Sequence, residues 1–185
     1  MKIKTMLLLA ILFSISSFSW SQYMMMTLDG QVQGKFKTES NRPGFSDKTE
    51  VLGYIMEVKS PRDVATGQSS GKRQHQPITI WKASGASSPQ FFQALTRNET
   101  IKKLTLEFYK PDDVFKKTEE LYYTIILENA FISGYRQLMG SPENPEFKAK
   151  NPGMYDEIKI VFQKVTVSEV KVKTSATDDW EGPSR

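Results

Sequence analysis

The stretch from residue 71 to residue 109 constrains the fold most strongly, because it predicts a strand, a short helix and a second strand in direct succession. Ile78 and Ile80 alternate with their neighbours as in a strand with one buried face. Ser88 is followed by proline, which is typical of a helix start, and Asn98 is suited to end that helix. Alternation then resumes and favours a strand. One short helix is therefore expected between two strands.

Apolar runs predict four further strands: residues 23–28, 50–59, 121–135 and 158–172. In the last of these, Ile158, Ile160 and Phe162 occupy even positions, whereas Val165 and Val167 occupy odd positions. Because side chains alternate between the two faces of a strand, such a change of phase needs a bulge or sharp bend near Gln163.

The strand predicted at residues 121–135 is apolar at both odd and even positions. A strand with one face in water would alternate more cleanly. We therefore expect both of its faces to be covered by a second sheet, the helix or a neighbouring subunit. This pattern is a first indication of oligomerisation.

Composition excludes several classes of protein. The chain has 185 residues, 38% of them apolar and 25% charged, which is typical of a soluble globular domain. Its formal net charge of +4 includes Lys2 and Lys4, and it falls to +2 (23 basic against 21 acidic residues) without them. Nucleic acid is therefore not an expected partner. With no cysteine, the chain has no disulfide, thiolate nucleophile or lipidation site for a membrane anchor.

Residues 1–21 have the three-part pattern of a secretory signal peptide. Two lysines precede an unbroken apolar run at residues 6–13, and Ser19 and Ser21 place small residues at the two positions that a signal peptidase reads. Cleavage after Ser21 would leave Gln22 as the new N-terminus. The alternatives are a buried N-terminal strand or a start codon at one of the methionines at residues 24–26.

Several segments together resemble the hemolysin-coregulated protein (Hcp) family, the tube subunit of type VI secretion systems. In chain order, they are GKRQHQPITIWK at 71–82, SSPQFFQAL at 87–95, KKLTLEFYK at 102–110, YYTIILENAFISGY at 122–135, YDEIKIVFQKVTVSEV at 155–170 and ATDDW at 176–180. They span nearly everything after residue 22, although none is a catalytic signature.

The resemblance implies a mainly β fold, a β-barrel of two antiparallel sheets with one short α-helix packed on it. This single domain is expected over residues 22–173, with residues 174–185 as a flexible C-terminal tail. The resemblance also implies a homo-hexameric ring whose copies stack into a hollow tube. The implied partners are the type VI sheath, spike and effector proteins.

The apparent leader departs from the family pattern, because Hcp subunits are normally made without one and loaded into the tube from the cytoplasm. With a cleaved leader, the protein is expected to be secreted or periplasmic. Without cleavage, it is expected in the cytoplasm until the type VI apparatus exports it.

A polar loop is predicted at residues 60–72, where the resemblance places a protruding loop that takes part in ring-to-ring contact. Loops this long are usually functional or disordered, so a flexible excursion is the alternative. Arg62 and Asp63 are candidates for pairing with charges on a facing ring, Gly67 and Gly71 for bending the backbone, and Val64 lies between them.

The sequence offers little for catalysis. His75 is its sole histidine, and a nucleophilic triad with Asp63 and Ser69 or Ser70 is conceivable. No nucleophile-elbow pattern surrounds any serine, so packing or hydrogen bonding is favoured for His75. No metal-ligand spacing and no phosphate-binding loop is present. We therefore predict no catalytic residue, metal site or cofactor, and no enzymatic activity.

Three functional interpretations remain. The first is a structural ring-forming subunit of the type VI secretion tube, with effectors carried in its lumen. The second is an exported Hcp-like ring protein that acts as a secreted binding or effector protein without tube firing. The third is a small β-barrel hydrolase, which the lack of a convergent site disfavours. The leader separates the first two.

Overall fold

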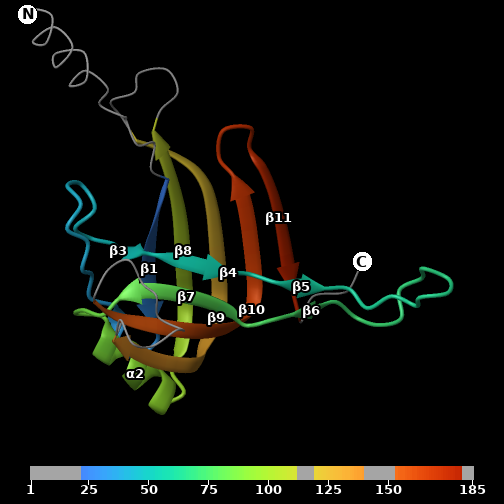
Figure 1. The fold of residues 1–185 in the computed structure, drawn as a ribbon, viewed down its shortest axis with the longest axis horizontal. Coiled ribbons are helices and arrows are strands. Elements are labelled where there is room, and N and C mark those ends of the chain that lie inside the picture. Colours follow the sequence, from blue (N-terminus) through green and yellow to red (C-terminus); the bar gives the residue numbers. More distant parts are fainter. Residues whose placement is uncertain (1–21, 112–118, 140–152, 181–185) are drawn as a thin grey trace, which may run out of the picture.

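The fold was analysed in a computed structural model, which describes residues 22–111, 119–139 and 153–180. Figure 1 shows long strands that wrap around a common core, with one helix against them. The prediction of a mainly β fold with antiparallel sheets and one short helix is confirmed for these residues. The predicted leader, residues 1–21, lies outside the described residues.

The described elements follow one another along the chain with long strands in its second half. They are β1 (Tyr23–Gly30), β2 (Gly34–Lys35), β3 (Thr49–Val51), β4 (Gly53–Ile55), β5 (Val58–Lys59), β6 (Gln74–His75), β7 (Ile78–Ala83), α2 (Ser88–Thr96), β8 (Thr100–Pro111), β9 (Glu119–Met139), β10 (Met154–Glu169) and β11 (Thr174–Asp179). The strand–helix–strand order predicted for residues 71–109 is therefore present as β7, α2 and β8.

The barrel closes because one short segment joins both margins of its sheet. The main path of the sheet runs β2-β1-β8-β9-β10-β7-β4. β3 pairs with β1, whereas β4, only one residue later, pairs with β7. Between them, the Leu52 backbone N–H donates to the Trp81 carbonyl at 2.8 Å. The segment from Thr49 to Ile55 therefore leaves one margin and joins the other.

The predicted change of phase in the last long strand is present, and β9 changes phase at the same level. In β10, the buried positions are even-numbered up to Phe162 and continue at the odd-numbered Val165. In β9, they are odd-numbered from Ile125 to Leu127 and continue at the even-numbered Ala130. Asn129 lies in the left-handed region, with φ of 49°. The pairing of the two strands keeps its register across this level and shifts between Lys159 and Ile160 instead. The two strands therefore bend together.

This bend explains part of the two-sided apolar pattern of β9. Ile125 and Leu127 face the core before the bend, and Ala130 and Ile132 face it after the bend. One barrel therefore buries residues of both parities, so the pattern by itself does not require a neighbouring subunit. Phe131 points away from the core and is 41% exposed.

The helix packs against the core through Phe91, which is fully buried and lies edge-on to Phe36 with the ring centroids 5.2 Å apart. Ser88 begins the helix as predicted, but its hydroxyl accepts from the N–H of Gly85 at 2.8 Å rather than from the first turn of the helix. The helix ends at Thr96, and Asn98 turns the chain with φ of 51°. In the described residues, no helix is long and apolar enough to cross a membrane.

The expectation of a flexible tail from residue 174 is wrong for Thr174–Asp179, which form β11. Six register pairs join this strand to β10, from Glu169 with Thr174 to Lys164 with Asp179. The strand pairs with β10 alone and carries almost no apolar side chain. Because an edge strand can leave its side chains in water, hydrophobic patterning does not reveal it.

Candidate functional site

A two-stranded hairpin projects from the barrel and contains the loop predicted to make ring-to-ring contact. Val58 pairs with His75, and Lys59 with Gln74, in a small sheet separate from the barrel sheet. We call residues 58–75 the arm. In Figure 1, it extends away from the barrel beyond β5 and β6.

The charges at the tip of the arm are engaged within the arm. Arg62 forms an isolated bridge with Ser69, and its guanidinium donates to the Gly67 carbonyl at 3.0 Å. The Asp63 carboxylate accepts from the Thr66 backbone N–H at 2.7 Å and from the Thr66 hydroxyl at 2.8 Å. These hydrogen bonds hold the pKa of Asp63 below its usual range. Both residues therefore help to fix the shape of the tip.

Val64 is a fully exposed apolar residue of this folded tip, whose other residues are also exposed. Gly67 closes the turn: its N–H donates to the Asp63 carbonyl at 2.9 Å, and its φ of 68° favours glycine. Gly71 has no such need, since an added Cβ would meet only Pro61 at an ordinary contact distance of 3.7 Å. Hydrogen bonds within the tip therefore close it into a turn.

The predicted cleavage site lies at the edge of the described chain. Ser21 is outside the described residues, and Gln22 is the first of them. The side-chain oxygen of Gln22 accepts from the Tyr122 hydroxyl at 3.5 Å, just before β1. A chain that began at Gln22 would contain every described strand.

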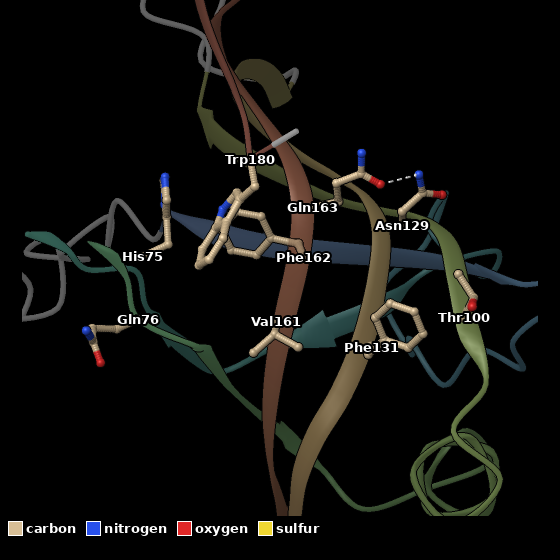
Figure 2. A pocket seen from close by; sticks show the side chains of 9 residues that line it. All are labelled: His75, Gln76, Thr100, Asn129, Phe131, Val161, Phe162, Gln163 and Trp180. Atoms are coloured by element: carbon tan, nitrogen blue, oxygen red, sulfur yellow. Dashed lines mark hydrogen bonds between the residues drawn. The ribbon is translucent and has the colours of Figure 1, made fainter. Parts of the chain in front are cut away.

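A groove of about 640 Å³ lies beside the base of the arm, over β9 and β10 (Figure 2). Its lining is mostly apolar, with amides and a hydroxyl among the apolar groups: His75, Gln76, Thr100, Asn129, Phe131, Val161, Phe162, Gln163 and Trp180. Phe131 and Val161 are register partners, and both are partly exposed. Exposed apolar surface of this kind commonly marks a contact with another protein.

His75 is a packed residue of this groove. Its side chain is only 5% exposed, and Nε2 lies 2.6 Å from a carboxylate oxygen of Asp178. The ring also contacts Phe162 and Trp180, at centroid distances of 5.4 and 5.6 Å. The structure therefore does not assemble the conceivable triad with Asp63 and Ser69, whose contacts lie in the arm. Across the described chain, no group of three or more His, Cys, Asp or Glu could hold a metal ion.

Sequence reasoning missed two residues of this region. Asp178 and Trp180 were expected in a flexible tail, but both contact His75 from the end of β11. No local pattern connects residues 178–180 with residues 73–75. The sequence does contain a basic Arg-x-His segment and an acidic Asp-Asp-Trp segment, whose charges are complementary. Their spacing along the chain could not show that they meet.

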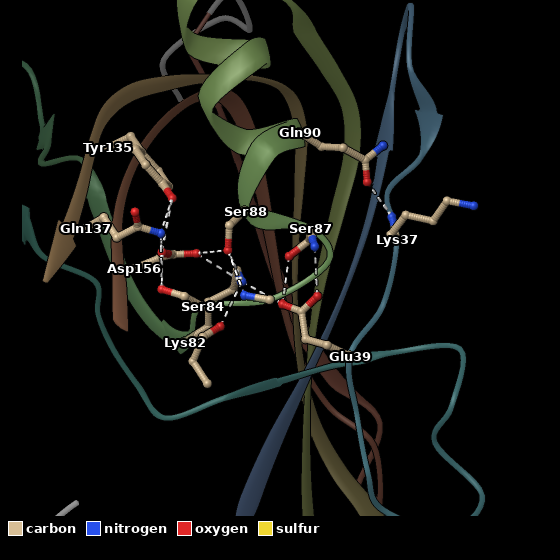
Figure 3. A network of polar contacts seen from close by, with 12 residues as sticks. Lys37, Glu39, Lys82, Ser84, Ser87, Ser88, Gln90, Tyr135, Gln137 and Asp156 are labelled. Carbon is tan, nitrogen blue, oxygen red and sulfur yellow. Dashed lines mark hydrogen bonds and ion pairs between the residues drawn. The ribbon is translucent and has the colours of Figure 1, made fainter. Parts of the chain in front are cut away.

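A buried polar network ties the start of α2 to the barrel (Figure 3). The Lys82 ammonium contacts carboxylate oxygens of Glu39 and Asp156, the latter at 3.1 Å. The side chains of Lys82 and Asp156 have no solvent exposure. Ser84 donates to Asp156 at 2.6 Å, and Ser88 also donates to it. Each buried charge therefore has a partner, as burial requires.

Tyr135 and Ser87 extend this network at its two ends. The Tyr135 hydroxyl donates to Asp156 at 3.0 Å, and the pKa of Tyr135 rises to about 12 because of its burial and the nearby carboxylate. Ser87 donates to Glu39 through its backbone N–H at 2.9 Å and through its hydroxyl at 2.7 Å.

The network is suited to holding the helix rather than to nucleophilic chemistry. Ser88 lies 3.2 Å from the Lys82 ammonium, but that ammonium also contacts two carboxylates. Burial raises the pKa of Asp156, but hydrogen bonds from Ser84, Ser88 and Lys82 outweigh it and leave the pKa below its usual range.

This geometry defines a class of protein: a small closed antiparallel β-barrel with one helix and a protruding hairpin. Two solved structures have the same fold. A crystal structure of an Hcp protein superposes with a TM-score of 0.76 at 21% identity, over 86% of this chain and 100% of that one. The secreted protein Hcp3 from Pseudomonas aeruginosa gives 0.69 at 24% identity, over 88% and 100% of the two chains.

Sequence comparison carries the assignment further. Residues 23–169 match the family described as "Type VI secretion system effector, Hcp". The chain is also 32% identical over 143 residues to the "Major exported protein" of Pseudomonas aeruginosa, covering 76% of this chain and 79% of that protein. The chain therefore belongs to the Hcp family of type VI secretion systems, as its motifs indicated.

Proposed function

We propose that this chain is a structural subunit of a type VI secretion tube, with no enzymatic activity of its own. Its hexameric rings stack into a hollow conduit, whose lumen carries effectors, and its partners are the sheath, the spike and those effectors. The observation that carries the proposal is the arm, a preformed hairpin on a member of this family.

The internal contacts of the arm suit it to reach a second ring. Ordering a loop on binding costs about 1–2 kcal/mol for each residue that is fixed, and the bonds of Asp63 and Arg62 fix the tip beforehand. Val64 then offers an apolar side chain, whose full burial contributes about 1.5 kcal/mol. Six such contacts for each ring would decide whether rings stack.

The groove surface supports contact within a ring. Phe131, Val161 and Trp180 are each more than a third exposed on one outer surface of the barrel. A contact between two different patches of identical copies closes into a ring when its rotation divides a full turn. We assign this surface to the contact between neighbouring subunits.

Ring formation and stacking are separable by experiment. Native mass spectrometry of the protein from Gln22 onward should show six copies, and a stable monomer at micromolar concentration would contradict the ring. Replacing residues 64–70 with a short Gly-Ser turn should keep single rings and abolish tubes in electron micrographs, at modest cost to folding. Tubes of unaltered length would contradict the role of the arm.

A milder pair of variants controls for exposed surface in general. Val64→Ser should weaken stacking, whereas Val32→Ser should not. Val32 is a valine 77% exposed and belongs to the turn after β1, not to the arm. Equal effects of the two changes would show that stacking responds to surface hydrophobicity rather than to the tip.

A second candidate function follows from the leader pattern of residues 1–21. A cleaved subunit would be diverted into the envelope or secreted, and it could act there as a ring-forming binding or effector protein without tube firing. The name of the Pseudomonas relative, "Major exported protein", is compatible with either route. Intact mass of protein from its native host decides: cleavage predicts a chain that begins at Gln22, whereas retained Met1 or a start at Met24 removes this candidate.

A further inference from the structure

Two segments about 100 residues apart meet where the arm leaves the barrel. The Arg73 guanidinium contacts the Asp178 carboxylate through Nε and Nη2, and Nη2 also donates to the Asp179 carbonyl at 3.0 Å. His75 Nε2 lies 2.6 Å from the same carboxylate. In Figure 1, β11 ends beside β5 and β6. We call Arg73, His75, Asp178 and Trp180 the clasp.

The clasp also has an apolar part that reaches the barrel wall. The His75 ring contacts Trp180, beyond the end of β11, and Phe162 of β10. Phe162 is buried in the core. His75 therefore connects the arm both to the C-terminal strand and to the barrel.

The remaining polar contacts described for the arm lie within its own hairpin or join Lys59 to Glu57, just before the arm. They include the turn at Asp63, the bridge between Arg62 and Ser69, and the bond from the Ser70 N–H to the Pro61 carbonyl at 3.0 Å. In the described part of the chain, the arm's polar contacts with another strand converge on Asp178 and Asp179. An isolated two-stranded hairpin is only marginally stable, so its direction depends on what holds its base.

We propose that the clasp sets the direction of the arm, and that Asp178 and Arg73 are therefore positioning residues for ring stacking. This inference rests on the proposed function, because it assumes that the arm makes the contact between rings. The C-terminal strand β11 thereby takes part in ring stacking, because it holds the base of the arm. A facing ring must receive all arms of one ring together, so an arm that is already oriented lowers the ordering cost of each contact.

The direction of the arm is measurable in the full mature chain. Since the sequence has no cysteine, Val64→Cys and Lys102→Cys place spin labels only at the tip of the arm and at one exposed position of β8. Diluting labelled chains into an excess of unlabelled chains restricts the measured distances to one subunit. The intact clasp should give a narrow distribution, and Asp178→Asn or Arg73→Gln should make it about twofold wider.

A matched control removes a carboxylate from the same barrel without touching the arm. Glu128 pairs with Lys164 at 2.7 Å on β9 and β10, so Glu128→Gln should leave the distance distribution unchanged. Circular dichroism and native mass spectrometry show whether each variant keeps its barrel and rings. Because the two clasp variants alter opposite partners, either one that folds gives the test.

The outcomes separate this inference from the proposed function. A wide distribution with loss of tubes supports both. A wide distance distribution with tubes of full length supports the proposed role of the clasp but overturns the stacking role of the arm. A distribution as narrow as that of the parent in the folded clasp variants overturns the clasp, whatever happens to the tubes.

Discussion

Asn129 donates to the side-chain oxygen of Gln163 at 2.9 Å, and this bond lies at the level where β9 and β10 both change the face that they turn to the core. Asn129 takes the left-handed backbone conformation that the bend requires. The two side chains also line the groove, so one bend shapes both the core and the outer surface.

Asn129→Val should destabilise the fold, because left-handed geometry costs about 1–2 kcal/mol for a residue other than glycine, asparagine or aspartate. A β-branched side chain adds strain there. Asn129→Gly is the matched control, since it keeps the conformation and loses only a partly exposed hydrogen bond, worth about 1 kcal/mol or less. Urea unfolding curves measure both free energies of unfolding, and equal losses would contradict a conformational role for Asn129.

Asp156→Asn should reveal the contribution of the buried network to stability. The folded pKa of Asp156 lies below its unfolded value of about 3.9. Its contribution is therefore present at neutral pH and is lost as the pH falls below about 4 toward the folded pKa. At pH 7, Asp156→Asn should lower the free energy of unfolding by about 3 kcal/mol, because the buried Lys82 then keeps only one of its two carboxylate partners, Glu39.

Unfolding measured at several pH values checks this prediction. The difference in the free energy of unfolding between the parent and Asp156→Asn should become smaller as the solution is acidified below about pH 4. Glu128→Gln, which breaks a largely exposed pair, should cost no more than about 1 kcal/mol at neutral pH. A gap that is constant with pH would assign the effect to packing rather than to charge.

His75→Ala should leave hexamers intact, because the imidazole of His75 contributes to the clasp. None of the described groups around this imidazole makes it a catalyst. It should nevertheless widen the range of arm positions, since the bond to Asp178 is lost. His75→Gln restores an amide donor and should recover the arm in part. Native mass spectrometry and the spin-label distance report the two effects separately. Loss of secretion in a variant that keeps rings, arm order and tubes would contradict the structural role.

Val161→Glu should prevent ring closure, because it places a charge in the apolar surface assigned to the contact between subunits. Lys159→Glu introduces the same side chain two residues away on β10, at another exposed position, and should leave rings intact. Native mass spectrometry should show monomers for the first variant and hexamers for the second. Hexamers in both would move the subunit contact to another surface.

The sequence predicted the elements whose signals are local. Alternation at Ile78 and Ile80 placed β7, the Ser-Pro pair placed α2, and the change of phase after Phe162 located the bend. What escaped prediction depends on long-range contacts. β11 has no apolar face to reveal it, and Asp178 and Arg73 lie 105 residues apart in the sequence although they are in contact in the fold.

The arm was predicted in position but not in its internal chemistry. Residues such as Arg62 and Asp63 can serve a partner or their own turn, and only the folded backbone shows which groups they reach. The apolar positions on both faces of β9 predicted cover by a second sheet, the helix or a neighbouring subunit, and were interpreted as an indication of oligomerisation. The bend at Asn129 brings Ile125 and Leu127, and then Ala130 and Ile132, to the same core within one chain, whereas Phe131 remains exposed.

The segment from Thr49 to Ile55 gives the barrel a seam. Three register pairs hold it to β1 and three to β7, whereas fifteen join β9 to β10. Local opening of a folded protein begins where the fewest backbone bonds must break. Amide protons along this seam should therefore exchange with solvent well before those of β9 and β10, and a subunit under strain would split there while its longest strands stay paired.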